Sequence, residues 1–212
     1  MVRKLASARQ RDKLGLFVAE GEDLVDAAAG AGLEPVELLV AGETVAAEVL
    51  AEVSTLPHPA RVIGVFRRED LPPAELRPVA LALWRVADPG NVGTLIRTAD
   101  AFGASVEPSD GCADPTGPKA LRASAGAVFR VPIGRAEGRR IGLVAHGGRP
   151  LAEVELCDGT VFVLGAEREG LPPEVEAECD ELVTIPMPGT AESLNVAAAG
   201  AIALYEWRRR RG

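Results

Sequence analysis

Histidine and cysteine are scarce in this sequence, and their scarcity limits the chemistry that it can support. Among 212 residues there are two histidines, His58 and His146, and three cysteines, Cys112, Cys157 and Cys179. The cysteines are widely spaced and never form a CxxC pair, so they indicate neither a zinc site nor a disulfide framework. Two isolated histidines also argue against a histidine-based metal centre and against a Ser-His-Asp triad. We therefore expect no bound metal.

Long apolar runs are missing as well. No run reaches the roughly 18 apolar residues that a membrane-spanning helix needs. The basic N-terminus, MVRKLASARQRDKLG, lacks the apolar stretch of a signal peptide. We expect a cytoplasmic protein that does not enter a membrane.

Positive charge is in deficit, and it is unevenly distributed, with one basic cluster at each end of the chain. The net charge of −8 argues against a large non-specific surface for nucleic acid. Such clusters at chain ends are often only solvated, but an acidic protein can also bind RNA through local basic patches. Four arginines close the chain, and the N-terminal cluster supplies three candidate RNA contacts: Arg9, Arg11 and Lys13.

The first third of the chain predicts a small α/β unit. The expected helices cover residues 2–13, 23–31 and 43–52, and the expected strands cover residues 16–19, 36–40 and 61–66. This unit has no catalytic cluster, so a binding role fits it better than chemistry. The polar stretch 67–78 holds three prolines and no apolar period, which is typical of a linker. We divide the chain into a substrate-binding domain, 1–76, and a larger domain, 77–212.

The larger domain alternates strands and helices, which predicts a parallel sheet with helices on both faces. Its expected strands are residues 79–84, 105–106, 128–133, 141–145, 161–164 and 182–185. Its expected helices are residues 94–102, 119–127 in part, 173–179 and 194–207, the last with Ser193 as its N-cap. The fold class is therefore α/β.

Three loops with unusual composition follow strands of this sheet: residues 88–104, 164–172 and 185–195. Ligands of open α/β sheets bind beyond the carboxyl ends of the strands. The first loop lacks both GxGxxG and GxxxxGK[ST], so it is neither a standard dinucleotide site nor a phosphate loop. Thr94 and Arg97 share a helix face there. Arg97 could grip a phosphate or a hydroxyl, or it could simply pair with Asp100 or Glu107.

The terminal stretch joins a Pro-Gly loop to a helix of small residues. Pro186, Pro188 and Gly189 force a tight turn. Gly200 lies within the helix, where glycine costs about 1 kcal/mol relative to alanine, so we expect another element to pack closely there. The stretch could be a terminal packing helix, or its loop could face a small ligand.

Four segments together match a known pattern: NVGTLIRTADAFG (91–103), KALRASAGAVFRVPI (119–133), VLGAEREGL (163–171) and IPMPGTAESLNVAAAGAIALYE (185–206). The sequence resembles the SpoU/TrmH family of RNA ribose 2′-O-methyltransferases, within the SPOUT superfamily. The N-terminal segment RDKLGLFVAEGEDLVDAA is similar to the small substrate-binding domain of that family.

The resemblance implies a fold, a cofactor and partners. The fold is a parallel-sheet SPOUT domain with a C-terminal trefoil knot, and the partners are rRNA or tRNA and a second copy of the chain, with the active site near the dimer interface. S-adenosylmethionine would lie in the knot against Leu164, Gly165, Ile185, Met187 and Leu194.

The resemblance also implies catalytic residues. Arg97 would activate the ribose 2′-hydroxyl, or orient it, because arginine hardly ever loses its proton. The polar residues expected to hold the loops and the substrate are Asn91, Glu167, Ser193 and Asn195. Ala166 stands where many family members have Asn, which puts a loop or substrate contact in question. Two alternatives stay open: a non-catalytic RNA-binding member of the same fold, and an unrelated nucleotide-binding α/β protein, which fits the composition but not the motifs.

Overall fold

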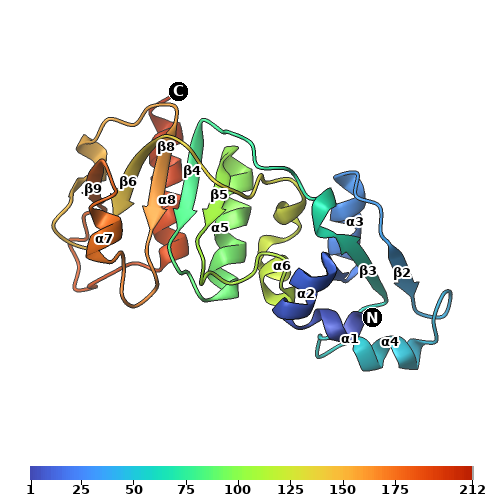
Figure 1. Ribbon diagram of the computed structural model, residues 1–212. Helices are drawn as coiled ribbons and strands as arrows, with labels where there is room; N and C mark the ends of the chain where they lie inside the picture. Colours follow the sequence, from blue (N-terminus) through green and yellow to red (C-terminus); the bar gives the residue numbers. More distant parts are fainter. Residues whose placement is uncertain (212) are drawn as a thin grey trace.

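Two sheets at opposite ends organise the molecule, which is elongated (Figure 1). The computed structural model describes residues 1–211. A three-stranded antiparallel sheet occupies the N-terminal end, and a six-stranded parallel sheet occupies the other end. Within the described residues, no helix combines the length and apolar character needed to cross a membrane.

The N-terminal unit follows the predicted order of elements, although the predicted helix 43–52 begins only at Ala47. The predicted helix 2–13 is two helices, because Ser7 adopts an extended conformation (φ −86°, ψ 129°) that interrupts the helix. The sheet has the strand order β1-β3-β2. The elements are α1 Val2–Leu5, α2 Ala8–Leu14, β1 Leu16–Glu20, α3 Glu22–Gly30, β2 Glu37–Val40, α4 Ala47–Val53 and β3 Val62–Arg67, followed by a 3₁₀ turn, Arg68–Asp70.

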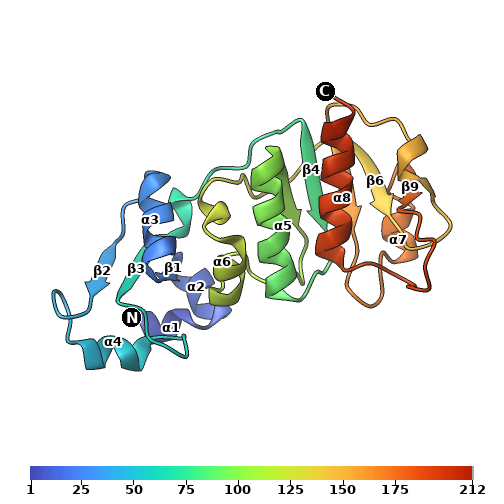
Figure 2. The ribbon, with the colours of Figure 1, turned by 180° about the vertical axis from the view of Figure 1, so that it is seen from behind.

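The second unit is the predicted parallel α/β sheet. Its strand order is β5-β4-β8-β6-β9-β7. Helices α5 and α8 cover one face, and the short α7 lies on the other (Figures 1 and 2). The strands are β4 Val79–Leu83, β5 Ser105–Pro108, β6 Arg139–Leu143, β7 Arg149–Pro150, β8 Thr160–Leu164 and β9 Glu181–Thr184. The helices are α5 Pro89–Phe102, α6 Pro118–Ser124, α7 Pro173–Glu176 and α8 Val196–Arg209, with 3₁₀ turns at Ala127–Phe129 and Leu151–Glu153.

The apolar run 128–133 is not the strand that we predicted. Its first residues belong to the 3₁₀ turn Ala127–Phe129, and only Ile133 forms an isolated bridge, to Val106. Periodicity alone cannot distinguish a short buried strand from a buried helical turn. The run is apolar because Val128 and Phe129 are buried in the core shared with the N-terminal unit.

Two helix starts were also predicted wrongly. Helix α5 begins at Pro89, earlier than predicted, because the Asp88 carboxylate accepts hydrogen bonds from the Gly90 and Asn91 amides. Helix α8 is capped by Asn195, whose side chain accepts from the Ala197 and Ala198 amides. Ser193 is therefore not the N-cap.

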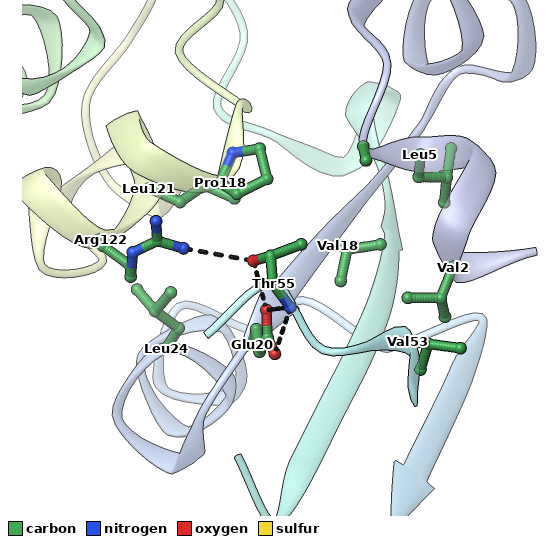
Figure 3. Close-up of a pocket in the computed structure, with 11 residues that line it drawn as sticks. Val2, Leu5, Val18, Glu20, Leu24, Val53, Thr55, Pro118, Leu121 and Arg122 are labelled. Atoms are coloured by element: carbon green, nitrogen blue, oxygen red, sulfur yellow. Dashed lines mark hydrogen bonds between the residues drawn. The ribbon is translucent and has the colours of Figure 1, made fainter. Parts of the chain in front are cut away.

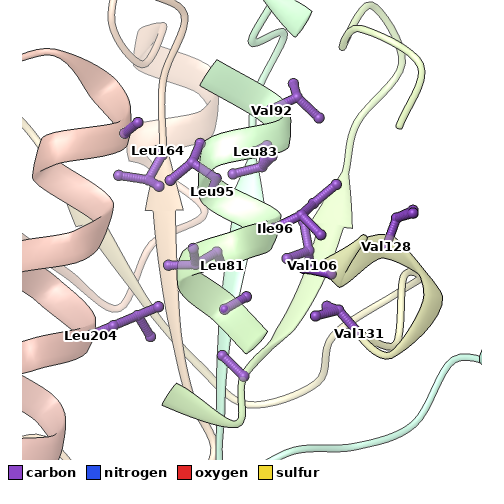
Figure 4. Close-up of a cluster of buried hydrophobic side chains, with 14 of the residues drawn as sticks. Leu81, Leu83, Val92, Leu95, Ile96, Val106, Val128, Val131, Leu164 and Leu204 are labelled. Atoms are coloured by element: carbon purple, nitrogen blue, oxygen red, sulfur yellow. The ribbon is translucent and has the colours of Figure 1, made fainter. Parts of the chain in front are cut away.

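Close packing of α5, α8 and the sheet builds the main core (Figure 4). Leu81 and Leu164, from neighbouring strands, lie against Leu95 of α5. A β-carbon at Gly200 would lie 2.4 Å from the Leu95 Cδ2 atom and 3.1 Å from the Leu164 Cδ1 atom. The predicted close packing at Gly200 is thus confirmed, and the elements that pack against it are α5 and β8.

The two units share one apolar core rather than meeting through a mobile linker. Phe17 of the N-terminal sheet stacks with both Phe66 and Phe129, and the ring centroids of the three side chains are 5.8–6.2 Å apart. Figure 3 shows a small pocket at this junction, where Arg122 of α6 donates to the Thr55 hydroxyl and Thr55 donates to Glu20. The division at about residue 76 stays a prediction: a cluster that includes Leu5, Leu50 and Ile63 belongs to the N-terminal unit alone, whereas the main core contains residues of both units.

Candidate active site

A cavity of about 420 Å³ opens at the carboxyl ends of β6, β8 and β9, where the sequence predicted a ligand. Loops after these three strands form its walls, together with the first turns of α8. All five predicted cofactor residues line it: Leu164, Gly165, Ile185, Met187 and Leu194. Two of the predicted polar residues, Glu167 and Ser193, line it as well.

The lining suits a cationic, partly apolar ligand such as S-adenosylmethionine. Ile185, Met187 and Leu194 offer apolar contacts, and Glu169 and Glu176 add carboxylates that favour positive charge. Within residues 1–211, no group of three or more His, Cys, Asp and Glu side chains is arranged to hold a metal ion.

The loop 165–170 is held by its backbone. The Ala166 amide donates to the Gly170 carbonyl at 3.1 Å, and the Gly170 amide returns a bond of 3.0 Å to Ala166. A β-carbon on Gly165 would lie 2.2 Å from the Gly170 carbonyl carbon, so only glycine fits there. Alanine in place of the more common asparagine at 166 therefore leaves these two loop hydrogen bonds intact.

Glu167 ties this loop to the start of α5. Its carboxylate accepts hydrogen bonds from the Asp88 amide at 3.0 Å, the Ala87 amide at 3.3 Å and the Asn91 side chain at 3.1 Å. Burial raises the pKa of Glu167, but these hydrogen bonds outweigh it and hold the pKa below its ordinary value. Glu167 is therefore ionised at neutral pH and acts as an acceptor that fixes two loops.

Replacing Glu167 with glutamine should weaken S-adenosylmethionine binding about fivefold, because one amide group cannot accept all three hydrogen bonds. Since the pKa is lowered in the folded protein, the stabilisation by the carboxylate is present above the unfolded-state pKa. It is lost as the pH falls through the folded-state pKa, which lies below the ordinary range of a glutamate.

Calorimetric titration measures the affinity, and melting temperatures of both proteins from pH 7 to pH 3 measure the stability. The difference in melting temperature should shrink toward zero at the acid end, whereas a constant difference would show that the Glu167 charge is not responsible.

Two asparagines continue the contact from Glu167 to α8. The Asn195 Nδ2 atom donates to the Asn91 Oδ1 atom at 3.0 Å, while Asn91 itself donates to Glu167. Asn195 also caps α8, so one side chain both starts the helix and reaches the neighbouring loop. Three predicted residues from three separate segments thus form one hydrogen-bonded row: the loop after β8, the first turn of α5 and the N-cap of α8. Ser193, two positions before Asn195, lines the cavity.

Arg97 lies on the exposed face of α5 and does not line the cavity. It follows Asn91 by six residues, which is about 9 Å along an α-helix. The alternative of a surface ion pair is wrong for both proposed partners: Asp100 pairs with Arg130 at 2.6 Å, and Glu107 pairs with Arg140 at 2.7 Å. No residue in the range 1–211 pairs with Arg97 or accepts a hydrogen bond from its side chain.

Of the three predicted RNA contacts, the structure leaves two on the surface. Arg9 and Lys13 are exposed on α2. The Arg11 side chain is only 5% exposed, pairs with Asp114 at 2.8 Å and donates to the Leu5 and Ala6 carbonyls. The prediction for Arg11 is therefore wrong, because this guanidinium is already satisfied inside the protein.

Sequence reasoning missed the residues that follow β6. Val144, Ala145 and His146 line the cavity together with the loop 164–171. The rule that ligands bind beyond the carboxyl ends of strands applies equally to β6 and could have found them. A lysine was missed as well: the Lys119 ammonium donates to Asp88 at 2.8 Å, and with the Asn91 and Gly90 amides it lowers the pKa of Asp88.

Comparisons with known proteins agree with this site. The model of the SpoU rRNA Methylase family matches residues 78–205. The 23S rRNA (guanosine(2553)-2′-O)-methyltransferase RlmP of Bacillus subtilis is 32% identical over 97% of this chain and 94% of its own length.

Two solved structures share the fold over 99% of this chain, each with a TM-score of 0.87. One is the AdoMet-bound rRNA methyltransferase from Sinorhizobium meliloti, 31% identical with 93% of its chain covered. The other is the SpoU methyltransferase AviRb from Streptomyces viridochromogenes with AdoMet, 26% identical with 96% covered. The resemblance found in the sequence is confirmed, and the chain belongs to the SpoU rRNA methylase family.

Proposed function

We propose that this protein is an S-adenosylmethionine-dependent methyltransferase that modifies a ribose 2′-hydroxyl in rRNA or tRNA, in the cytoplasm. One observation carries the proposal: the row Glu167–Asn91–Asn195 starts at the wall of a cavity suited to the cofactor and links the loop after β8 to the starts of α5 and α8. The RlmP relative, named for a 2′-O-methyl transfer on rRNA, supports the choice of reaction.

The residues of the chain bind and orient rather than supply a reactive group. When bound, S-adenosylmethionine supplies an activated methyl group, so no metal is required. Glu167 and Asn91 hold the loops in place, and Asn195 stands closest in the row to α8. We assign to Arg97 the orientation of the 2′-hydroxyl and of a neighbouring phosphate, because a guanidinium keeps its proton and binds phosphate oxygens in a fixed geometry.

Methyl transfer from labelled S-adenosylmethionine tests the function directly. The substrate is total RNA from a strain that lacks the gene, and the modified position is mapped as a 2′-O-methyl site. Gly165→Val is the control, because its side chain cannot fit against Gly170. We expect incorporation with the wild-type protein alone. Cofactor binding by calorimetry without incorporation into any RNA would contradict the proposal.

A homodimer would complete the site. On α8, Ile202 is 38% exposed and Tyr205 is 58% exposed, although both are large and apolar. They lie on the side of the sheet that α8 shares with α5, which carries the exposed Arg97 (Figure 2). A two-fold dimer through this surface would bury the apolar side chains and bring Arg97 toward the cavity of the second copy.

Replacing Ile202 with aspartate should therefore convert the dimer to a monomer, since a charge would have to be buried in an apolar interface. Light scattering coupled to size exclusion measures the mass, with Val49→Asp as the control because Val49 is exposed on α4, in the other unit. We expect one chain per particle for Ile202→Asp and two for the control. Two chains for both variants would place the interface elsewhere.

RNA would contact the surface of α2 through its free cations. Changing Arg9 and Lys13 to glutamine should weaken RNA binding and reduce the slope of log K against log salt by about 1.5, because two fewer counterions are released. Fluorescence anisotropy with an rRNA fragment at several salt concentrations measures the slope. Arg208→Gln, exposed near the end of α8, is the control and should change the slope less. Equal effects of both changes would show that α2 is not the contact.

The trefoil knot stays part of the proposal. It is supported by the close packing of α8 through Gly200 and by the loop after β9, which lines the same cavity as the loops after β6 and β8.

A further inference from the structure

The sheet face opposite α5 and α8 is thinly covered and carries a second cavity of about 460 Å³. Side chains alternate between the two faces along β4, which places Ala80 and Ala82 on this face. Because these side chains are short, they leave space above the sheet. Only the four-residue α7 and nearby loops pack over it in the second unit (Figure 1). The cavity lies above Ala82 of β4 and Val163 of β8.

Trp84 forms one wall of this second cavity. It follows β4 directly and continues the face of Ala80 and Ala82. The side chain is partly exposed, and within residues 1–211 its indole N–H has no hydrogen-bond acceptor. The other tryptophan differs on both counts, because Trp207 is 5% exposed and donates to the Cys157 carbonyl at 3.2 Å. Trp84 thus leaves part of its aromatic ring uncovered by other side chains.

Polar groups surround this aromatic surface. Arg135 is exposed at the rim and has no ion-pair or hydrogen-bond partner for its side chain among residues 1–211. Arg140 is held by Glu107 at 2.7 Å, and Glu178 adds a carboxylate acceptor to the lining. A planar ring with hydrogen-bonding edges matches this set: a face to stack on tryptophan, acceptors for a guanidinium and donors for a carboxylate.

The second cavity lies next to the cofactor cavity. The Trp84 amide donates to the Leu164 carbonyl at 2.8 Å, and Leu164 lines the cofactor cavity. On α7, Val175 lines the second cavity and Glu176 lines the first. An RNA strand with its target ribose at the first cavity therefore has neighbouring nucleotides within reach of the second.

We propose that this second cavity binds an unpaired base of the RNA substrate, stacked on Trp84 and contacted by Arg135, beside the nucleotide that is methylated. The inference rests on the proposed function for the choice of RNA as ligand. It adds a site that would select single-stranded or opened RNA, because a paired and stacked base cannot enter a cavity.

Tryptophan fluorescence tests the contact itself. Subtracting the spectrum of Trp84→Phe from that of the wild-type protein isolates Trp84, while Trp207 stays unchanged in both. The probes are the ribonucleotide hexamers of adenosine and of uridine, and a hexamer of the same backbone without bases. We expect the two base-containing hexamers to quench Trp84 and the abasic hexamer not to. No quenching, or equal quenching by all three, would overturn the proposal.

Binding by variants gives the second measurement. Trp84→Leu should weaken binding of the base-containing hexamers by about 5- to 150-fold, and Trp84→Phe should restore most of it, since loss of one stacked base accounts for that range. Val49→Ala, exposed in the N-terminal unit, is the matched control. Cofactor affinity, measured by calorimetry, should be unchanged in all three and shows that the variants are folded. Hexamer binding unchanged in Trp84→Leu would overturn the base site.

The outcomes separate this inference from the proposed function. If the wild-type protein methylates RNA but Trp84 shows no base-dependent quenching, the proposed function is supported and the base site is ruled out. If the hexamers quench Trp84 in a base-dependent way but no RNA is methylated, the base site is supported and the proposed function is ruled out.

Discussion

Replacing Arg97 with alanine should lower the rate of methyl transfer to RNA by at least about 100-fold, because orienting the reacting groups supplies several kcal/mol. The affinity for S-adenosylmethionine should not change, since Arg97 does not line the cofactor cavity. Arg97→Lys should recover only part of the rate, because an ammonium lacks the planar fork of the guanidinium. Single-turnover rates with the mapped RNA measure the effect. If Arg97→Ala keeps half of the activity, Arg97 does not orient the reacting groups.

Mixing two inactive variants decides whether Arg97 acts on its own cavity or on that of the partner. Arg97→Ala keeps an intact cavity, and Gly165→Val keeps Arg97 but disrupts the cavity wall, because its side chain would clash with Gly170. In a mixed two-fold dimer, one complete site would form only if Arg97 reaches across the interface. Random exchange of subunits would then restore about a quarter of the wild-type activity. No recovery after subunit exchange would mean that Arg97 serves its own chain.

Replacing Asp114 with alanine should lower the free energy of unfolding by about 3 to 5 kcal/mol, because it leaves a buried charge without its partner. Asp114 accepts from Arg11 at 2.8 Å and from Arg68 at 2.6 Å, and thereby joins α2 and the segment after β3 to the loop before α6. Its other carboxylate oxygen accepts from the Thr116 amide and hydroxyl at 2.9 and 2.7 Å. Urea denaturation measures the loss.

A second substitution separates charge from packing at this junction. Arg11→Met removes the buried guanidinium, so the double variant with Asp114→Ala should be more stable than Asp114→Ala alone. Burial raises the pKa of Asp114, but hydrogen bonds from Thr116 and Arg11 and the charge of Arg68 outweigh it and hold the pKa below its ordinary value. The stabilisation is therefore present above the unfolded-state pKa and is lost as the pH falls through the lowered folded-state pKa. A double variant no more stable than Asp114→Ala would show that the buried charge is not the cause.

The candidate site could be predicted well from sequence wherever a loop follows a strand of the parallel sheet. Gly165 and Ile185, which the family resemblance assigned to the cofactor, both line the cavity, because the carboxyl ends of parallel strands meet at one edge of the sheet. The row of Glu167, Asn91 and Asn195 brings together motif residues that lie up to 104 positions apart. Their contacts could not be derived from spacing, because they depend on the strand order, which places β8 beside β4.

The errors have a common physical origin. Arg11 looked like a surface cation, because nothing local to α2 reveals that Asp114, 103 residues later, packs against it. The run 128–133 looked like a strand because burial, rather than sheet pairing, makes it apolar. In both cases contacts distant in sequence override a local pattern.

The sequence alone determined the class of fold, the loops that carry the site and the family, because local patterns and motif residues are written directly in the chain. Only the tertiary structure decided which cations remain free, which polar groups meet and where Trp84 opens a second cavity. These properties depend on which segments pack together, and a side chain becomes buried, paired or exposed only when distant parts of the chain have come into contact.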